Sequence, residues 1–114
     1  MLPPEHRLTR SDDFRLAVRG GRRAGSHTLV LHLADAPGDP AVPPAKIGFV
    51  VSKQVGNAVV RTKVKRRLRH VVRQDLGRVP AASLLVVRAK PEAALGSFAE
   101  LRSDFERCLD RVTS

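Results

Sequence analysis

The sequence predicts an α+β fold, a single sheet of about four strands with flanking helices. Three observations support this prediction. A chain of 114 residues has the length of one domain with one core, so we treat 1–114 as a single domain. Short apolar runs typical of strands alternate with longer segments whose apolar residues recur at helical spacing. Their order is αβββαβα, and we expect an antiparallel or mixed sheet with helices on one face.

The first half of the chain is predicted to contain a helix, a strand region and a connector. Ser11, followed by two aspartates, has the pattern of an N-cap, and the helix is expected to end at Gly20. The strand region that follows can split in two around Gly25 and includes TLVLHL at 28–33. The segment 35–45 contains four prolines, so we interpret it as an exposed connector.

The second half is predicted to form strand, helix, strand and helix. KIGFVVSK at 46–53 and SLLVVRA at 83–89 are the strands, with a basic helix over 58–76 between them. Such βαβ units generally have a right-handed crossover. The last helix follows Pro91 and opens with the capping-box pattern SFAE at 97–100. Its predicted apolar stripe comprises Phe98, Leu101, Phe105, Cys108, Leu109 and Val112.

The basic helix is the most informative segment of the chain. Its apolar residues recur at helical spacing and are expected to face the core: Val60, Val64, Leu68, Val71 and Val72. Seven cations occupy the remaining positions: Arg61, Lys63, Lys65, Arg66, Arg67, Arg69 and Arg73. Because seven like charges on one helix repel each other, a bound polyanion would relieve the repulsion. The pattern is typical of a helix that contacts nucleic acid.

The charge of the whole chain supports the same interpretation. The formal net charge is +10 and the sequence pI is about 11.4. The window 41–74 holds nine Lys or Arg residues and no Asp or Glu, so the charge is concentrated in a patch. A merely solvated helix face normally mixes both signs. We therefore expect an RNA-binding domain.

Several other classes of protein are not favoured by the sequence. The longest apolar runs have five or six residues and no secretory signal is seen, so we expect a cytoplasmic protein without a membrane span. The single cysteine, Cys108, has no partner for a disulfide or a metal site and is expected in the core. No catalytic residue and no metal-ligating residue is predicted in this chain.

Two alternative chemistries remain open. Histidines can act as an acid and a base in RNA cleavage, but the four in this chain lie in separate predicted elements: His6, His27, His32 and His70. Asp12 and Asp13 can hold a hydrated Mg²⁺ against phosphate, although acids in a first helical turn need no such explanation.

The segment KIGFVVSKQVGNAVVRTKVKRRLR at 46–69 closely resembles the signature of the bacterial ribonuclease P protein subunit family. In that family a strand ending in Ser-Lys precedes Gly-Asn-Ala, then Arg-Asn-Arg or Arg-Asn-Lys, then a basic helix. The resemblance also covers RLTRSDDF at 7–14 and LLVVRAKP at 84–91. Thr62 departs from the usual Asn, and Val18 and His32 stand where many members have aromatic residues.

The resemblance implies a fold like the second domain of a small-subunit ribosomal protein, with an unusual left-handed βαβ crossover in place of the right-handed one. It implies two partners, the catalytic RNA subunit and precursor tRNA, and no obligate protein partner is evident. The residues implied to bind the catalytic RNA are Lys53, Asn57, Arg61, Lys63, Lys65, Arg66 and Arg69. Those implied to line a cleft for the 5′ leader, between the first helix and the sheet, are Arg10, Phe14, His32, Phe49, Val51 and Lys90.

The resemblance also implies how the chain acts. Hydrolysis of precursor tRNA would depend on Mg²⁺ held through the RNA, and the protein would supply positive charge and leader binding. The holoenzyme would be an endoribonuclease that forms the mature 5′ end of tRNA. The competing hypothesis is a non-catalytic RNA-binding or ribosome-assembly protein with the same fold. Two residue roles also stay open: Phe14 can stack on a base or belong to the core, and Asn57 can contact RNA or cap the basic helix.

Overall fold

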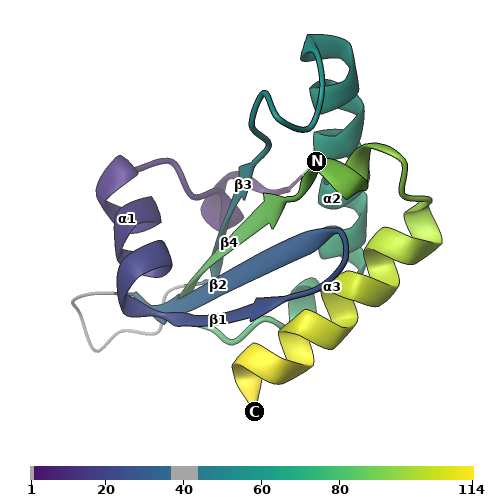
Figure 1. The fold of residues 1–114 in the computed structure, drawn as a ribbon. Helices are drawn as coiled ribbons and strands as arrows, with labels where there is room; N and C mark the ends of the chain where they lie inside the picture. The colour runs from purple at the N-terminus through teal and green to yellow at the C-terminus, as the bar shows by residue number, and fades with distance from the viewer. Residues whose placement is uncertain (1, 37–43) are drawn as a thin grey trace.

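A computed structural model describes residues 2–36 and 44–114 of the chain, so the centre of the predicted connector lies outside the described residues. The order αβββαβα is confirmed (Figure 1). Its members are α1 (Ser11–Gly20), β1 (Arg22–Gly25), β2 (Leu29–Asp35), β3 (Lys46–Val50), α2 (Ala58–Gln74), β4 (Ser83–Ala89) and α3 (Phe98–Thr113). Three short 3₁₀ turns accompany them: η1 (Pro4–His6), η2 (Leu76–Arg78) and η3 (Pro91–Ala94).

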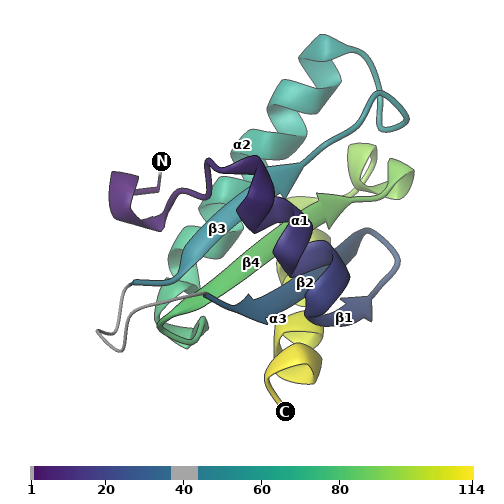
Figure 2. The same ribbon diagram turned by 90° about the vertical axis from the view of Figure 1, so that its left-hand side faces the viewer.

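The four strands form one mixed sheet in the order β1-β2-β4-β3. β1 pairs with β2 and β2 with β4 in antiparallel register, whereas β3 runs parallel to β4. The connection from β3 through α2 to β4 is the βαβ unit. In Figure 2 both strands run towards the upper right, β3 lies to the left of β4, and α2 lies behind them, which makes the crossover left-handed. The generic right-handed expectation is therefore wrong for this chain, and the left-handed crossover implied by the resemblance is confirmed.

Helices cover both faces of the sheet, so the prediction that they share one face is wrong. α1 packs on one face over a small cluster formed by Leu8, Ala17, Leu84 and Val86. α2 and α3 pack on the other face over the main core (Figures 1 and 2). The reason lies in β2 and β4, whose central residues are buried on both sides. A sheet with two apolar faces needs a cover on each.

The ends of the elements differ in detail from the prediction. Arg10, and not Ser11, is the N-cap of α1, and no side chain caps this helix. β3 ends at Val50, three residues before the predicted end at residue 53, because the chain turns over 53–55. α2 ends at Gln74, and Leu76 begins a 3₁₀ turn.

The third helix begins as predicted but buries less of its stripe. The Ser97 side chain accepts a hydrogen bond from the Glu100 N–H, and the Glu100 carboxylate accepts one from the Ser97 N–H, which confirms the capping box. The stripe is buried from Leu101 to Val112, including Cys108, whereas Phe98 is 36% exposed. Phe98 is therefore not a core residue.

A buried carboxylate fastens α3 to the start of β2. The Asp104 Oδ2 accepts hydrogen bonds from the Thr28 N–H at 3.1 Å and from the Thr28 hydroxyl at 2.5 Å. Arg107 donates to the second oxygen at 2.7 Å. Burial alone would raise the pKa of Asp104, but these hydrogen bonds and the Arg107 charge lower it below its usual value.

The N-terminal segment covers part of the outer edge of β3. The Leu8 N–H donates to the Ile47 carbonyl at 3.0 Å, and Arg7 forms an isolated parallel bridge with Ile47. The His6 ring nitrogen Nδ1 lies 2.7 Å from the Ala45 carbonyl oxygen. These contacts bring residues 6–8 beside the edge strand, close to α2. None of the described helices is both long enough and apolar enough to span a bilayer.

Candidate nucleic-acid interface

The basic helix α2 buries its apolar stripe and turns its charge outward. Val64, Leu68, Val71 and Val72 are buried in the main core. Its cations are exposed or half-buried, and the ion pairs formed among the described residues use arginines outside α2. No acid in the part of the chain that the structure describes forms an ion pair with a cation of this helix, so its positive charge remains available to an anionic partner.

The turn before α2 is a compact cap. The Asn57 side-chain oxygen accepts a hydrogen bond from the Val60 N–H at 3.0 Å, which confirms the capping role of Asn57. A Cβ on Gly56 would lie 2.8 Å from the Val60 Cγ1, so the turn packs closely on the first helical turn. The Thr62 hydroxyl donates to the Ala58 carbonyl at 2.9 Å and is therefore turned back onto the helix. The RNA contact predicted for Asn57 stays a prediction.

A pocket of about 310 Å³ lies beside β3, between the N-terminal segment and α2. Phe14 and Phe49 contribute aromatic walls, and Lys65 and Arg69 contribute cations from α2. The pocket therefore joins residues predicted for the leader with residues predicted for the catalytic RNA. Arg7 also lines it, and its Nε donates to the Leu2 carbonyl at 3.0 Å.

Phe14 combines packing with partial exposure. Its ring packs against the small cluster under α1 and is half-buried. A Cβ on Gly48 would overlap this ring and would lie 2.5 Å from Cε1, so the ring rests on the β3 backbone. Both interpretations of Phe14 thus remain compatible with its position: part of the ring is packed, and part lines the pocket.

His32 lies on the α1 side of β2, between Arg23 of β1 and Val86 of β4. It is 3% exposed, and its Nε2 has no hydrogen-bond partner among the described residues. Burial, followed by the positive charges of Arg23 and Arg88, lowers the pKa of His32 below 6.5. The imidazole is therefore neutral at pH 7, and its position on this face agrees with the predicted cleft.

A second depression, of about 680 Å³, lies where β3 and β4 end. Lys53, Arg88 and Lys90 line it together. Lys53 was predicted to bind the catalytic RNA and Lys90 the leader, so the structure brings one member of each set to the same place. The Lys90 ammonium donates to the Ser26 carbonyl at 2.8 Å, which holds it beside the turn between β1 and β2.

The other predicted leader residues do not all share this face. Ile47, Phe49 and Val51 pack on the α2 and α3 side, and Val51 is only 8% exposed in the main core. The prediction that Val51 lines the cleft is therefore wrong, and Phe49 reaches only the pocket at the edge. The cause is the alternation of side chains along an extended strand, which places Gly48 and Val50 on the α1 side instead.

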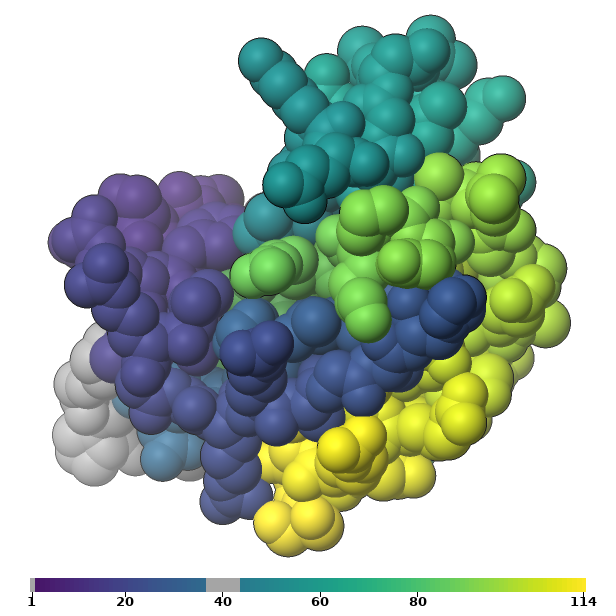
Figure 3. All heavy atoms as spheres, in the orientation of Figure 1, coloured from purple at the N-terminus to yellow at the C-terminus, as the bar shows by residue number. Residues whose placement is uncertain are grey.

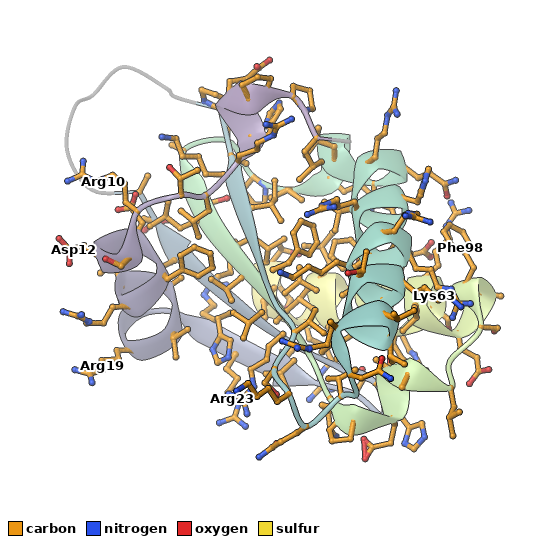
Figure 4. The ribbon with its side chains drawn as sticks, turned by 90° about the horizontal axis from the view of Figure 1, so that it is seen from above. Arg10, Asp12, Arg19, Arg23, Lys63 and Phe98 are labelled. Carbon is orange, nitrogen blue, oxygen red and sulfur yellow. The ribbon has the colours of Figure 1, made fainter. Side chains whose placement is uncertain are left out.

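Arg10 lies outside the cleft as well. It is the exposed N-cap residue at the beginning of α1, and Figure 4 shows its side chain directed outward, away from the sheet. Arg19, at the other end of the same helix, is also directed outward (Figure 4). Arg10 can contact RNA only at the rim of the cleft.

Sequence reasoning missed several residues of this surface. Arg88 is an exposed cation inside an otherwise buried strand, and this break in an apolar run was a signal that could have identified it. Arg23 and Val50 share the α1 side with it, as the strand registers show. In Figure 3, α1 and the first turns of α2 border a shallow hollow whose floor is formed by β2 and β4.

The alternative chemistries gain no support from the geometry. His32 lies on β2 and His70 on α2, on opposite faces of the sheet, and His6 contacts a backbone carbonyl. Asp12 forms an ion pair with Arg15 at 3.9 Å. Across residues 2–36 and 44–114, no group of three or more His, Cys, Asp or Glu side chains is placed to hold a metal ion.

Comparison with known proteins identifies the family. The family model described as Ribonuclease P matches residues 2–113. The ribonuclease P protein component of a Nocardioides species is 56% identical over 113 residues, covering 98% of this chain and 95% of the relative. That of Streptomyces griseus is 54% identical over 117 residues, with the same coverage of each chain.

Solved structures agree with the fold. The RNase P protein from Thermotoga maritima superposes with a TM-score of 0.78 at 24% identity, covering 93% of this chain and 96% of that one. The Staphylococcus aureus RNase P protein gives 0.79 at 23% identity, covering 93% and 94%. Because the family model and the close relatives span nearly the whole sequence, the chain belongs to the ribonuclease P protein family.

Proposed function

We propose that this chain is the protein subunit of a bacterial ribonuclease P, acting in the cytoplasm with a catalytic RNA and precursor tRNA. In this proposal α2 binds the catalytic RNA and the α1 side of the sheet binds the 5′ leader. The holoenzyme removes the leader by hydrolysis and leaves the mature 5′ end of the tRNA. The observation that carries the proposal is the charge of α2, whose cations form no ion pair with an acid among the described residues.

The positive surface supports the role in assembly. Lys63 and Arg66 are exposed on α2, Lys65 and Arg69 border the pocket at the β3 edge, and Lys53 lies in the preceding turn. Each phosphate neutralised by such a cation releases counterions, which makes binding favourable and salt-dependent. If about four phosphates are contacted, the affinity should fall with salt at a logarithmic slope near −3, using about −0.7 per phosphate.

The α1 side of the sheet supports leader binding. A single strand presents unstacked bases, which aromatic and planar cationic side chains can hold without reading their sequence. Phe14 offers part of one ring, Arg88 and Lys90 provide cations at the depression, and Arg23 pairs with His32 on the neighbouring strand. Because mature tRNA has no leader, these contacts would favour substrate over product.

The Mg²⁺ that the reaction requires is proposed to be held by RNA phosphates. The side chains nearest the proposed RNA contact are cations, which do not ligate Mg²⁺, so the residues of α2 do not fit a metal site of their own. Their contribution is to lower the repulsion between catalytic RNA and precursor tRNA, so that less bulk Mg²⁺ is needed.

The test is cleavage of precursor tRNA at low Mg²⁺ by the cognate catalytic RNA, with and without this protein. We expect cleavage at the mature 5′ end only when both are present, and none by the protein without RNA. A protein that binds ribosomal RNA but leaves this reaction unchanged would instead be an assembly factor. Cleavage by RNA-free protein would place catalytic residues in the chain and refute the proposal.

A further inference from the structure

Two apolar side chains are exposed together where η3 meets α3. Leu95 is 93% exposed, and Phe98, one of the four aromatic residues of the chain, is 36% exposed. Exposing such side chains to water is unfavourable. We call this pair, with the intervening Gly96 and Ser97, the η3–α3 turn.

The η3–α3 turn is held in place and packs against α2. The Arg67 guanidinium donates from Nη1 to the Gly96 carbonyl at 3.1 Å, and the capping box fixes Ser97. A Cβ on Gly96 would lie 3.4 Å from the buried Leu101 side chain, so the turn also contacts the core. Its apolar side chains are therefore presented on a supported backbone.

Cations border the turn on its α2 side. Lys63 lies one helical turn before Arg67, and no acid among the described residues pairs with either. Figure 4 shows Lys63 and Phe98 on the side of the molecule opposite α1 and Arg10. The nearest acid in the sequence, Glu100, is engaged in the capping box. An exposed aromatic ring on the turn and cations without an acidic partner on the helix that the turn contacts match the two parts of a nucleotide, a base and a phosphate.

We propose that the η3–α3 turn is a second RNA contact, at which an unpaired base of the catalytic RNA stacks on Phe98 while Lys63 binds its phosphate. This inference rests on the proposed function, because it extends the α2 interface across Arg67 to α3. The bound nucleotide differs from the leader, since α1 and the turn lie on opposite sides of the sheet (Figure 1). Two apolar side chains are too few for the core of a stable protein interface, whereas one exposed ring is enough for one base.

A tryptophan placed in the turn reports the contact directly, because the chain contains no Trp or Tyr. Phe98→Trp should show quenched fluorescence when the cognate catalytic RNA is added. The matched control is Leu16→Trp on α1, a position of similar exposure at 38%. Its fluorescence should not change with catalytic RNA alone. An unchanged signal from the tryptophan at 98 would overturn the inference.

Affinity measurements separate stacking from packing. Phe98→Ala should weaken binding of the catalytic RNA about 5- to 150-fold, the equivalent of one lost base stack. Phe98→Leu keeps an apolar side chain without an aromatic face and should bind as weakly as Phe98→Ala. Full affinity of Phe98→Leu would show that an apolar filler suffices and would overturn stacking. Melting temperatures of both variants close to that of the unsubstituted protein are expected if Phe98 acts at the surface.

The same series distinguishes failure of the inference from failure of the proposed function. If the unsubstituted protein does not bind the catalytic RNA, the proposed function fails and this contact fails with it. If it binds, and Phe98→Ala binds equally well, only the contact is refuted. Sedimentation adds a further outcome: a self-association that Phe98→Ala abolishes without changing RNA affinity would assign the turn to a second copy of the chain and overturn the RNA contact.

Discussion

Gly48→Ala tests the placement of Phe14 on the β3 backbone. The added methyl group would overlap the Phe14 ring and lie 2.5 Å from Cε1, with the Leu8 Cδ2 at 3.0 Å. The ring must move, and overpacking of this kind costs about 1 to 3 kcal/mol of unfolding free energy. For a domain of this size that corresponds to a lower melting temperature by roughly 4 to 12 °C.

A double-mutant cycle identifies the cause of that loss. Phe14→Ala alone should cost about 2 kcal/mol, less than the 3 to 5 kcal/mol of a fully buried phenylalanine, because the ring is half-buried. In the Phe14→Ala background the new methyl group has space, so Gly48→Ala should then cost little. The expected coupling is about 1 to 3 kcal/mol, measured by denaturant unfolding of all four proteins.

The control is Gly77→Ala, because a Cβ at Gly77 meets nothing within 4 Å. This variant should unfold like the unsubstituted protein. Additive effects of Gly48→Ala and Phe14→Ala, within about 0.5 kcal/mol, would refute the contact between the ring and β3. Under the proposed function, Gly48→Ala should also weaken binding of leader-bearing precursor tRNA and leave mature tRNA unaffected.

Three further predictions concern charge. Arg61→Glu with Arg66→Glu should abolish assembly with the catalytic RNA and leave the melting temperature unchanged. Arg15→Glu with Arg19→Glu changes the net charge equally and should leave assembly intact. Equal losses of RNA affinity in the two double variants would contradict a localised interface. The hydrogen bonds that lower the pKa of Asp104 stabilise the fold at pH values above 3.8, the pKa of this carboxyl in the unfolded chain. The loss of unfolding free energy on acidification below that pH should therefore be smaller in Asp104→Asn. Because the pKa of His32 is lowered from 6.5, protonation favours the unfolded chain, and the free energy of unfolding should fall as pH drops below 6.5. If the same dependence of this free energy on pH is measured in His32→Gln, His32 is not its cause.

The sequence predicted the elements well where the pattern was long. α2 was identified from an apolar stripe that recurs over several turns, and Val64, Leu68, Val71 and Val72 are indeed buried. The capping box at Ser97 is a local pattern whose two hydrogen bonds involve neighbouring residues, so it could be predicted without the tertiary structure. The predicted split of the first strand region around Gly25 is also confirmed, since β1 ends at Gly25 and β2 begins at Leu29.

The leader set was predicted less well because it depends on which face each strand residue occupies. A shift of one residue moves a side chain to the opposite face of a sheet. Phe49 and Val51 share the parity of Ile47 and therefore face the main core, whereas Val50 faces α1. Sequence alone also could not reveal that Lys53 and Lys90 line the same depression, since the strand order places the ends of β3 and β4 side by side.

The position of β4 between β2 and β3 affects how the chain can fold during synthesis. β2 can pair with β1 early, but β2 and β3 do not pair with each other, so β3 has no strand partner and β2 lacks its second one until residues 83–89 have left the ribosome. Until then β2 has one open edge, β3 is unpaired with any strand, and the segment containing the basic helix has no complete sheet to cover. Contacts between segments far apart in sequence form slowly. A chain truncated before Ser83 should therefore remain unfolded and prone to aggregation, even though most of its helical and strand segments are already present.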